Sequence, residues 1–84
     1  MATVEDRVKE ILLSILDVTP EDIVPTASFI DDLKATSIDI VEILTALQNA
    51  FDVNISDEEA GKIRTVQDTV DLLKAAIAQK DAKA

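Results

Sequence analysis

Ser37 is the residue whose position in the sequence most strongly suggests chemistry. It follows Thr36 where an apolar helical pattern begins, so we expect it at the first position of a helix. Backbone amides without partners at a helix start, together with the helix dipole, favour an attached or bound phosphate. The chain has no His and no Cys, so the hydroxyl lacks an imidazole to activate it as a nucleophile. The pattern predicts an anchor for a phosphoester; an ordinary first-turn hydroxyl is the alternative.

Acidic residues outnumber basic ones by 17 to 8, which gives a net charge of −9. Residues 10–61 contain twelve acidic side chains and a single basic one, Lys34. Such an uncompensated field favours the docking of basic partners, although acidity can also serve solubility alone. The docking candidates lie in a stretch without Lys or Arg, from residue 35 to residue 61. They are Asp39, Glu42, Asp52, Asp57, Glu58 and Glu59.

The same composition excludes several classes of function. A chain of this charge with two aromatic residues is poorly suited to nucleic acid. It has no zinc ligand set, and Asp31, Asp32 and Asp39 lack EF-hand spacing, so we expect no specific metal site. We expect a monomer that is not an enzyme. No apolar run approaches about 20 residues and the first residues show no leader pattern, which predicts a cytoplasmic protein without membrane insertion.

Helical periodicity indicates the elements that must position Ser37. Apolar residues recur at helical spacing over residues 4–16, 37–50 and 66–79, and Ser56 with Glu59 opens a short helix. Pro20 predicts one short turn within a long loop over residues 17–35. This loop can pack on the core through Ile23, Val24, Phe29, Ile30 and Leu33. The sequence thus predicts an all-α fold, a small four-helix bundle with a long ordered loop between its first two helices. We expect one domain over residues 1–79 and a flexible tail over residues 80–84.

Three segments of the chain resemble a known family when they are taken together. They run from Asp6 to Leu12, from Thr26 through Ser37 to Asp52, and from Ile55 to Gln67. In order, loop length and acidity they are similar to bacterial acyl carrier proteins of the type II fatty acid synthase kind. The resemblance implies that a phosphopantetheinyl transferase moves 4′-phosphopantetheine from coenzyme A onto Ser37.

The same resemblance implies what the modified serine does. The thiol of the arm carries acyl intermediates as thioesters, in fatty acid or specialised lipid or polyketide biosynthesis. Acyl-transferring and acyl-modifying enzymes reach it with basic docking patches. The acyl chain can be sheltered among the helices, and plain core packing is the alternative role for each lining candidate. These candidates are Val41, Leu44, Leu47, Phe51, Ile63 and Val66.

Some residues depart from the family pattern. The signature Asp-Ser-Leu is replaced by Thr36-Ser37-Ile38, which keeps a helix cap but removes a negative charge beside the hydroxyl. Lys34 stands where the family usually has Gly, and residues 48–50 replace a stretch that is often acidic. We interpret these departures as signs of a specialised carrier with its own partner enzymes. The alternative is a non-carrier adaptor that docks a basic enzyme through the same acidic helix.

Overall fold

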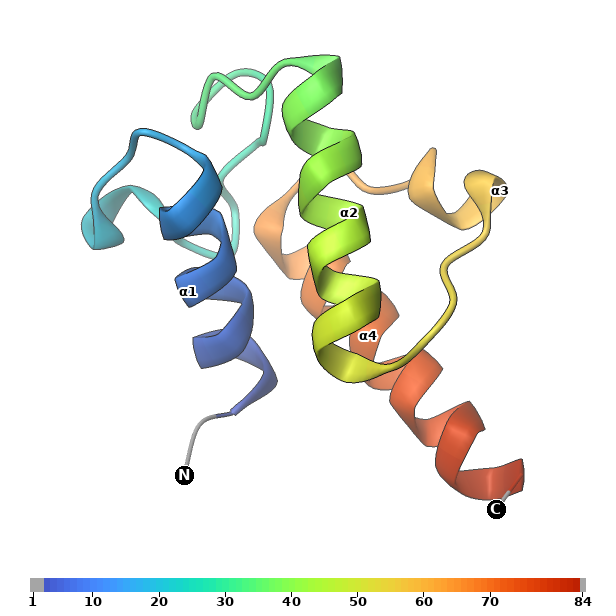
Figure 1. The fold of residues 1–84 in the computed structure, drawn as a ribbon. Helices are drawn as coiled ribbons and strands as arrows, with labels where there is room; N and C mark the ends of the chain where they lie inside the picture. The colour runs from blue at the N-terminus through green and yellow to red at the C-terminus, as the bar shows by residue number, and fades with distance from the viewer. Residues whose placement is uncertain (1–2, 84) are drawn as a thin grey trace.

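The computed structural model describes the backbone of residues 3–83 and the side chains of residues 3–80. Its helices are α1 (Val4–Ile15), a 3-10 turn η1 (Pro20–Asp22), α2 (Ser37–Phe51), α3 (Asp57–Ala60) and α4 (Val66–Lys83). Apart from one isolated bridge between Ser28 and Thr65, these residues form no strand pairing. The predicted all-α fold with three long helices and a short third helix is confirmed (Figure 1). Within the described range, no helix has the length and apolarity needed to cross a membrane.

Local hydrogen bonds explain where the helices begin. Ahead of α1, the Thr3 hydroxyl accepts the Asp6 amide at 3.1 Å and the Asp6 carboxylate accepts the Thr3 amide at 3.3 Å. Ser56 and Glu59 form the same reciprocal pair ahead of α3. Each pair satisfies two donors that the helix itself leaves without partners. The helix starts predicted from these short motifs are therefore confirmed.

The long loop between α1 and α2 covers the core, as its apolar residues predict. Ile23, Phe29 and Leu33 are buried. Val24 and Ile30 are not: they are 43% and 63% exposed, so their predicted packing is wrong. Each of the two directly follows a buried residue, Ile23 or Phe29, and faces solvent instead of the core. The buried apolar side chains of the three long helices are Val8, Leu12, Ile43, Leu47, Val66, Val70 and Leu73.

Backbone hydrogen bonds fasten this loop to the start of α4. The Phe29 amide donates to the Arg64 carbonyl at 3.1 Å, and the Val66 amide donates to the Ala27 carbonyl at 3.1 Å. A third bond of this kind is made one residue further into α4. The first amides of α4 thus find acceptors outside their own helix. The loop that leads to Ser37 is therefore held by a segment far along the chain.

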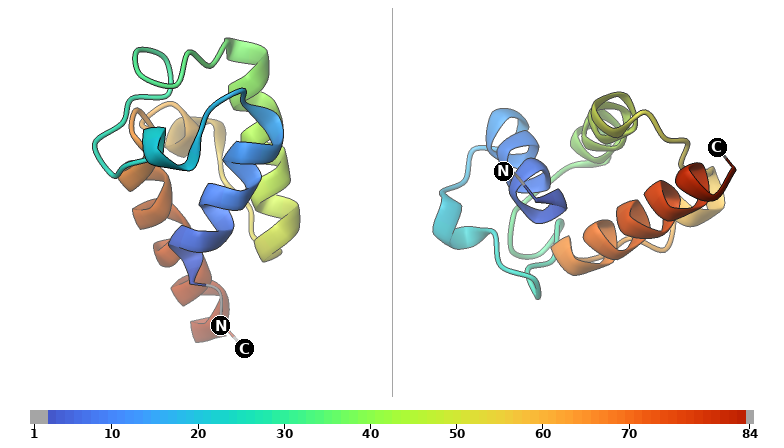
Figure 2. Two further views of the ribbon diagram at one scale, coloured as in Figure 1. Left: turned by 90° about the vertical axis from the view of Figure 1, so that its left-hand side faces the viewer. Right: turned by 90° about the horizontal axis from the view of Figure 1, so that it is seen from below.

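The helices surround the core unevenly. α1 packs against both α2 and α4, and the view along the bundle shows these three helices around the core (Figure 2). α3 lies on the side of α2 opposite to α1 (Figure 1). That side of α2 therefore faces the short helix and the link from residue 61 to residue 65 rather than a long helix.

The structure corrects the predicted end of the last helix. Residues 80–83, predicted as a flexible tail, continue α4 to Lys83. Lys80 Nζ lies 3.0 Å from Asp52 Oδ2 at the end of α2, and this contact between distant residues was not visible in the local pattern. Ala84 lies outside the described residues, and the domain limits stay a prediction.

Candidate functional site

Ser37 is the first residue of α2, and its side chain is exposed. The preceding residue caps the helix: the Thr36 hydroxyl accepts the Asp39 amide at 3.2 Å, and the Asp39 carboxylate accepts the Thr36 amide at 3.0 Å. The Ile40 amide donates to the Thr36 carbonyl at 3.0 Å. Among the described residues, nothing accepts the amides of Ser37 and Ile38, and nothing hydrogen-bonds to the Ser37 hydroxyl. The hydroxyl is thus displayed beside two donors.

These features fit a phosphate-linked group on Ser37. The hydroxyl lies at the positive end of a helix of 15 residues, where the dipole and the amides of the first turn stabilise a phosphate. Because the side chain is exposed, a phosphodiester there keeps its contact with water. The Thr36 cap holds the turn in place without using the serine. The predicted position of Ser37, at the first residue of the helix, is confirmed.

A small apolar cavity lies on the α3 side of α2. Its wall consists of Phe29, Ile40, Ile43, Leu44 and Ile63, and its volume is about 10 Å³. This is space for about one water molecule. An open groove of about 410 Å³ adjoins the cavity and shares Phe29, Ile40 and Ile63 with it. An acyl chain can enter the cavity only if these walls move apart.

Two of the six predicted lining residues, Leu44 and Ile63, line this cavity. Val41 does not face the interior as predicted: it is 62% exposed, next to Ile38 at 72%. The apolar face of α2 is so broad that residue spacing does not show which flank meets solvent. The remaining candidates are buried or half-buried core residues, namely Leu47, Val66 and Phe51.

Sequence reasoning missed three residues of the cavity wall. Ile40 and Ile43 belong to the wide apolar face of α2, so their burial was expected but their role was not. Phe29 reaches the cavity from the loop through the backbone bond to Arg64, a long-range contact with no local signal. The cavity wall is complete only because the loop that contains Phe29 lies beside the segment that precedes α4.

The acidic docking candidates differ in how far their charge is offset. The stretch itself offers no basic partner, but Asp52 pairs with Lys80 at 3.0 Å and Glu58 lies 4.0 Å from Lys62. Both bases come from outside the Lys- and Arg-free stretch. Asp39 and Glu59 are engaged in helix caps. Within the part of the chain whose side chains are described, no ion pair involves the two remaining candidates, Glu42 and Asp57.

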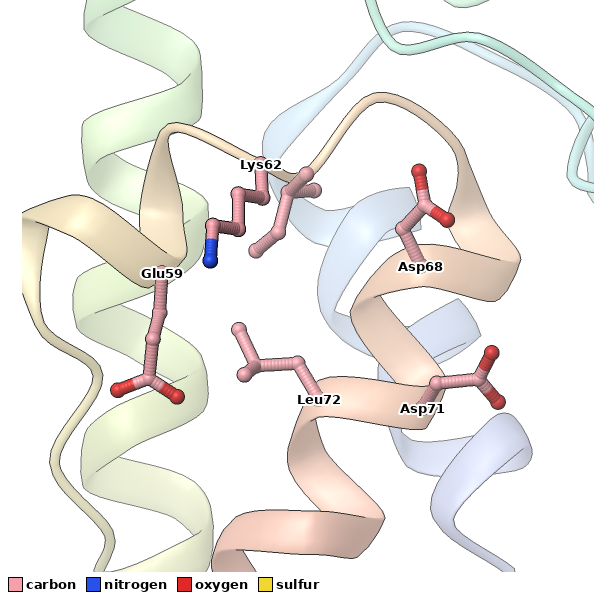
Figure 3. Close-up of a pocket in the computed structure, with 6 residues that line it drawn as sticks. Glu59, Lys62, Asp68, Asp71 and Leu72 are labelled. Atoms are coloured by element: carbon pink, nitrogen blue, oxygen red, sulfur yellow. The ribbon is translucent and has the colours of Figure 1, made fainter.

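A second open groove, of about 300 Å³, lies between α3 and α4 and is shown in Figure 3. Its rim includes Glu59, Lys62 and Asp71, and the carboxylates of Glu59 and Asp71 lie at opposite edges of it (Figure 3). Within the described residues, no group of three or more acids is arranged to hold a metal ion.

Asp68, in the same groove, serves the start of α4. Its carboxylate accepts the backbone amides of Arg64 and Thr65, both at 3.1 Å. These hydrogen bonds, first that from Arg64 and then that from Thr65, hold the pKa of Asp68 below its ordinary value of 3.8, and the charge of Arg64 adds a smaller effect. Because the ionised form is the one that accepts both bonds, this acid contributes to the fold at neutral pH.

Comparison with known proteins agrees with this geometry. Residues 6–73 match the model of the family described as phosphopantetheine attachment site. Three curated relatives, each called acyl carrier protein, come from Buchnera aphidicola subsp. Acyrthosiphon pisum, strains Tuc7, 5A and APS. Each is 50% identical over 74 residues, which is 88% of this chain and 92% of the relative. The chain therefore belongs to the acyl carrier proteins within the phosphopantetheine-attachment family, and its prosthetic group is covalent 4′-phosphopantetheine.

Proposed function

We propose that Ser37 carries the 4′-phosphopantetheine arm, and that the protein transports acyl intermediates on it as thioesters for fatty acid biosynthesis. The exposed hydroxyl at the start of α2, beside two amides without acceptors among the described residues, carries this proposal. The thiol comes with the arm, and so a chain without Cys suffices. Catalysis belongs to the enzymes that load, extend and unload the carrier, and we place this exchange in the cytoplasm.

Intact-mass analysis tests the attachment site. Wild-type protein incubated with coenzyme A and a phosphopantetheinyl transferase is expected to gain one phosphopantetheine group, and Ser37→Ala is expected to gain none. Ser14→Ala is the matched control. The Ser14 hydroxyl is also exposed, but it already donates a hydrogen bond to the Ile11 carbonyl at 2.7 Å. A gain in Ser37→Ala would contradict the site. Unmodified protein from the native host under all growth conditions would favour the adaptor instead.

We further propose that Thr36 makes the chain selective for its own transferase. Thr caps the helix as Asp would, but places no charge next to the hydroxyl. Thr36→Asp is therefore expected to keep the fold and to be modified faster by a transferase of general fatty acid synthesis. Equal initial rates for wild type and Thr36→Asp would refute a specialised carrier of this kind.

Basic partner enzymes, beginning with the transferase, are proposed to dock on the acidic side of α2 and α3. Glu42 supports this, because it is exposed and forms no ion pair with the described residues. Glu42→Gln is expected to weaken binding to the transferase about two- to fivefold at low salt, in line with one exposed charge pair. Glu21→Gln, in η1, is the control for net charge alone. Equal effects of both changes would argue against a specific surface.

The cavity beside α2 is proposed to take up the acyl chain. At about 10 Å³ it must expand, so the gain from burying each added methylene competes with the packing that is disturbed. Protein loaded with a medium-length acyl group is expected to melt at a higher temperature than protein loaded with acetyl, because the cargo stabilises only the folded state. Identical Tm values for the two loaded forms would show that the acyl chain stays outside the protein.

A further inference from the structure

The groove that adjoins the apolar cavity begins one helical turn from Ser37. Ile40, three residues after Ser37, lines both the groove and the cavity. In an α-helix these two positions are neighbours on one face, about 4.5 Å apart along the axis. A chain attached to the Ser37 hydroxyl can therefore turn directly into the groove.

The polar lining of this groove is mixed in charge. Arg64 supplies guanidinium donors, Asp31 supplies carboxylate acceptors, and Ser28 adds a hydroxyl. The groove is thus suited neither to an anion nor to a cation, but to a neutral chain that has both donors and acceptors. Pantetheine is such a chain, because its two amide groups each offer an N–H and a carbonyl oxygen.

The Arg64 side chain is available for this contact. Its backbone is committed, because the carbonyl accepts the Phe29 amide and the amide donates to Asp68. Among residues with described side chains, no carboxylate forms an ion pair with the guanidinium. The side chain can therefore be changed without removing the backbone bonds that fix the groove.

Building on the attachment at Ser37, we propose that Arg64 is a positioning residue for the prosthetic arm. The arm folds back into the groove, and the Arg64 guanidinium donates to an amide carbonyl of the arm, while Asp31 accepts an amide N–H. The thiol end then lies against Phe29, Ile40 and Ile63, at the edge of the apolar cavity. In this position the thiol is withdrawn from solvent until a partner enzyme draws the arm out.

The alkylation rate of the thiol in the modified protein tests this role. With a neutral alkylating reagent at fixed pH, wild type is expected to react more slowly than free pantetheine. Arg64→Ala is expected to react about two- to tenfold faster than wild type, the effect of losing one hydrogen bond from the docked state. Arg64→Lys is expected to restore part of the protection. Lys62→Ala removes a neighbouring charge that lines the other groove and is expected to leave the rate unchanged.

The sign of the effect separates docking from simple electrostatics. Loss of a nearby cation alone raises the pKa of a thiol and slows its alkylation, whereas release of a docked arm speeds it. A rate for Arg64→Ala equal to or below that of wild type would overturn the proposal, as would an equal acceleration in Lys62→Ala. Failure of the attachment itself would be seen earlier and separately, as an absent mass increase.

Discussion

Lys34 has a left-handed backbone conformation, with φ at 58°. Its neighbours prevent it from relaxing: the Leu33 amide donates to the Ser28 carbonyl at 3.0 Å, and the Ala35 amide donates to the Phe29 carbonyl at 2.7 Å. Both flanking side chains are also buried. A residue with a Cβ loses about 1–2 kcal/mol in this region relative to the right-handed one. The family's usual Gly at this position would avoid that strain.

Lys34→Gly is therefore expected to stabilise the protein. Relief of about 1–2 kcal/mol of strain is partly offset by about 0.4–1 kcal/mol of extra chain entropy in the unfolded state. The net gain is about 1 kcal/mol, which corresponds to a rise in Tm of about 4–8 °C for a domain of this size. Urea titration and thermal melting followed by circular dichroism measure both quantities.

Lys34→Gln is the matched control for this prediction. It keeps the Cβ and hence the strain, but it removes the charge, as Lys34→Gly does. In a chain of net charge −9, the loss of a cation by itself is expected to destabilise slightly. If Lys34→Gly proved no more stable than Lys34→Gln, backbone strain at this position would be refuted as the cause.

Three further predictions concern the core, the cap and pH. Leu47→Ala is expected to lower the free energy of unfolding by about 2–5 kcal/mol, because the Leu47 side chain is 0% exposed. Val41→Ala is expected to lower it by less than about 0.5 kcal/mol, because the Val41 side chain is 62% exposed. Similar urea midpoints for the two variants would contradict this contrast. Thr36→Ala is expected to lose about 1 kcal/mol through its cap and Thr36→Asp almost nothing, and equal losses would show that the cap is not the cause. Asp68 has a folded pKa below its unfolded value, so its contribution is complete above about pH 4 and is lost as pH falls through the folded pKa. The difference in urea midpoint between wild type and Asp68→Asn should therefore shrink in acid, and a difference independent of pH would refute the reasoning.

The parts of the structure that depend on near neighbours were predictable from the sequence. The caps at Thr3, Thr36 and Ser56 bond to residues three positions ahead, so short motifs contain all the information required. The place of Ser37 at the start of α2 follows from the same local rule. Its proposed role as the attachment site rests on the resemblance rather than on these physical patterns.

The features that the sequence did not predict depend on contacts between residues far apart in the chain. Lys80 and Asp52 pair over 28 positions, and this pair joins the predicted tail to the end of α2. Val41 belongs to a helix whose apolar face is wider than the surface available to cover it. The cavity wall required the meeting of Phe29 and Ile63, which no periodicity reports.

The backbone bonds between the loop and the start of α4 also have a consequence during synthesis of the chain. Phe29 and Ala27 are made well before Arg64 and Val66, the residues to which they bond. When Ser37 has just been added to the growing chain, Arg64 and Val66, whose backbone groups hold the preceding loop, have not yet been made. Closing this long loop carries an entropy cost that the bonds to the later segment help to offset. Under the proposed function, a transferase that recognises this loop together with Ser37 therefore acts only after α4 has begun to form, so that modification of the serine would report a folded chain.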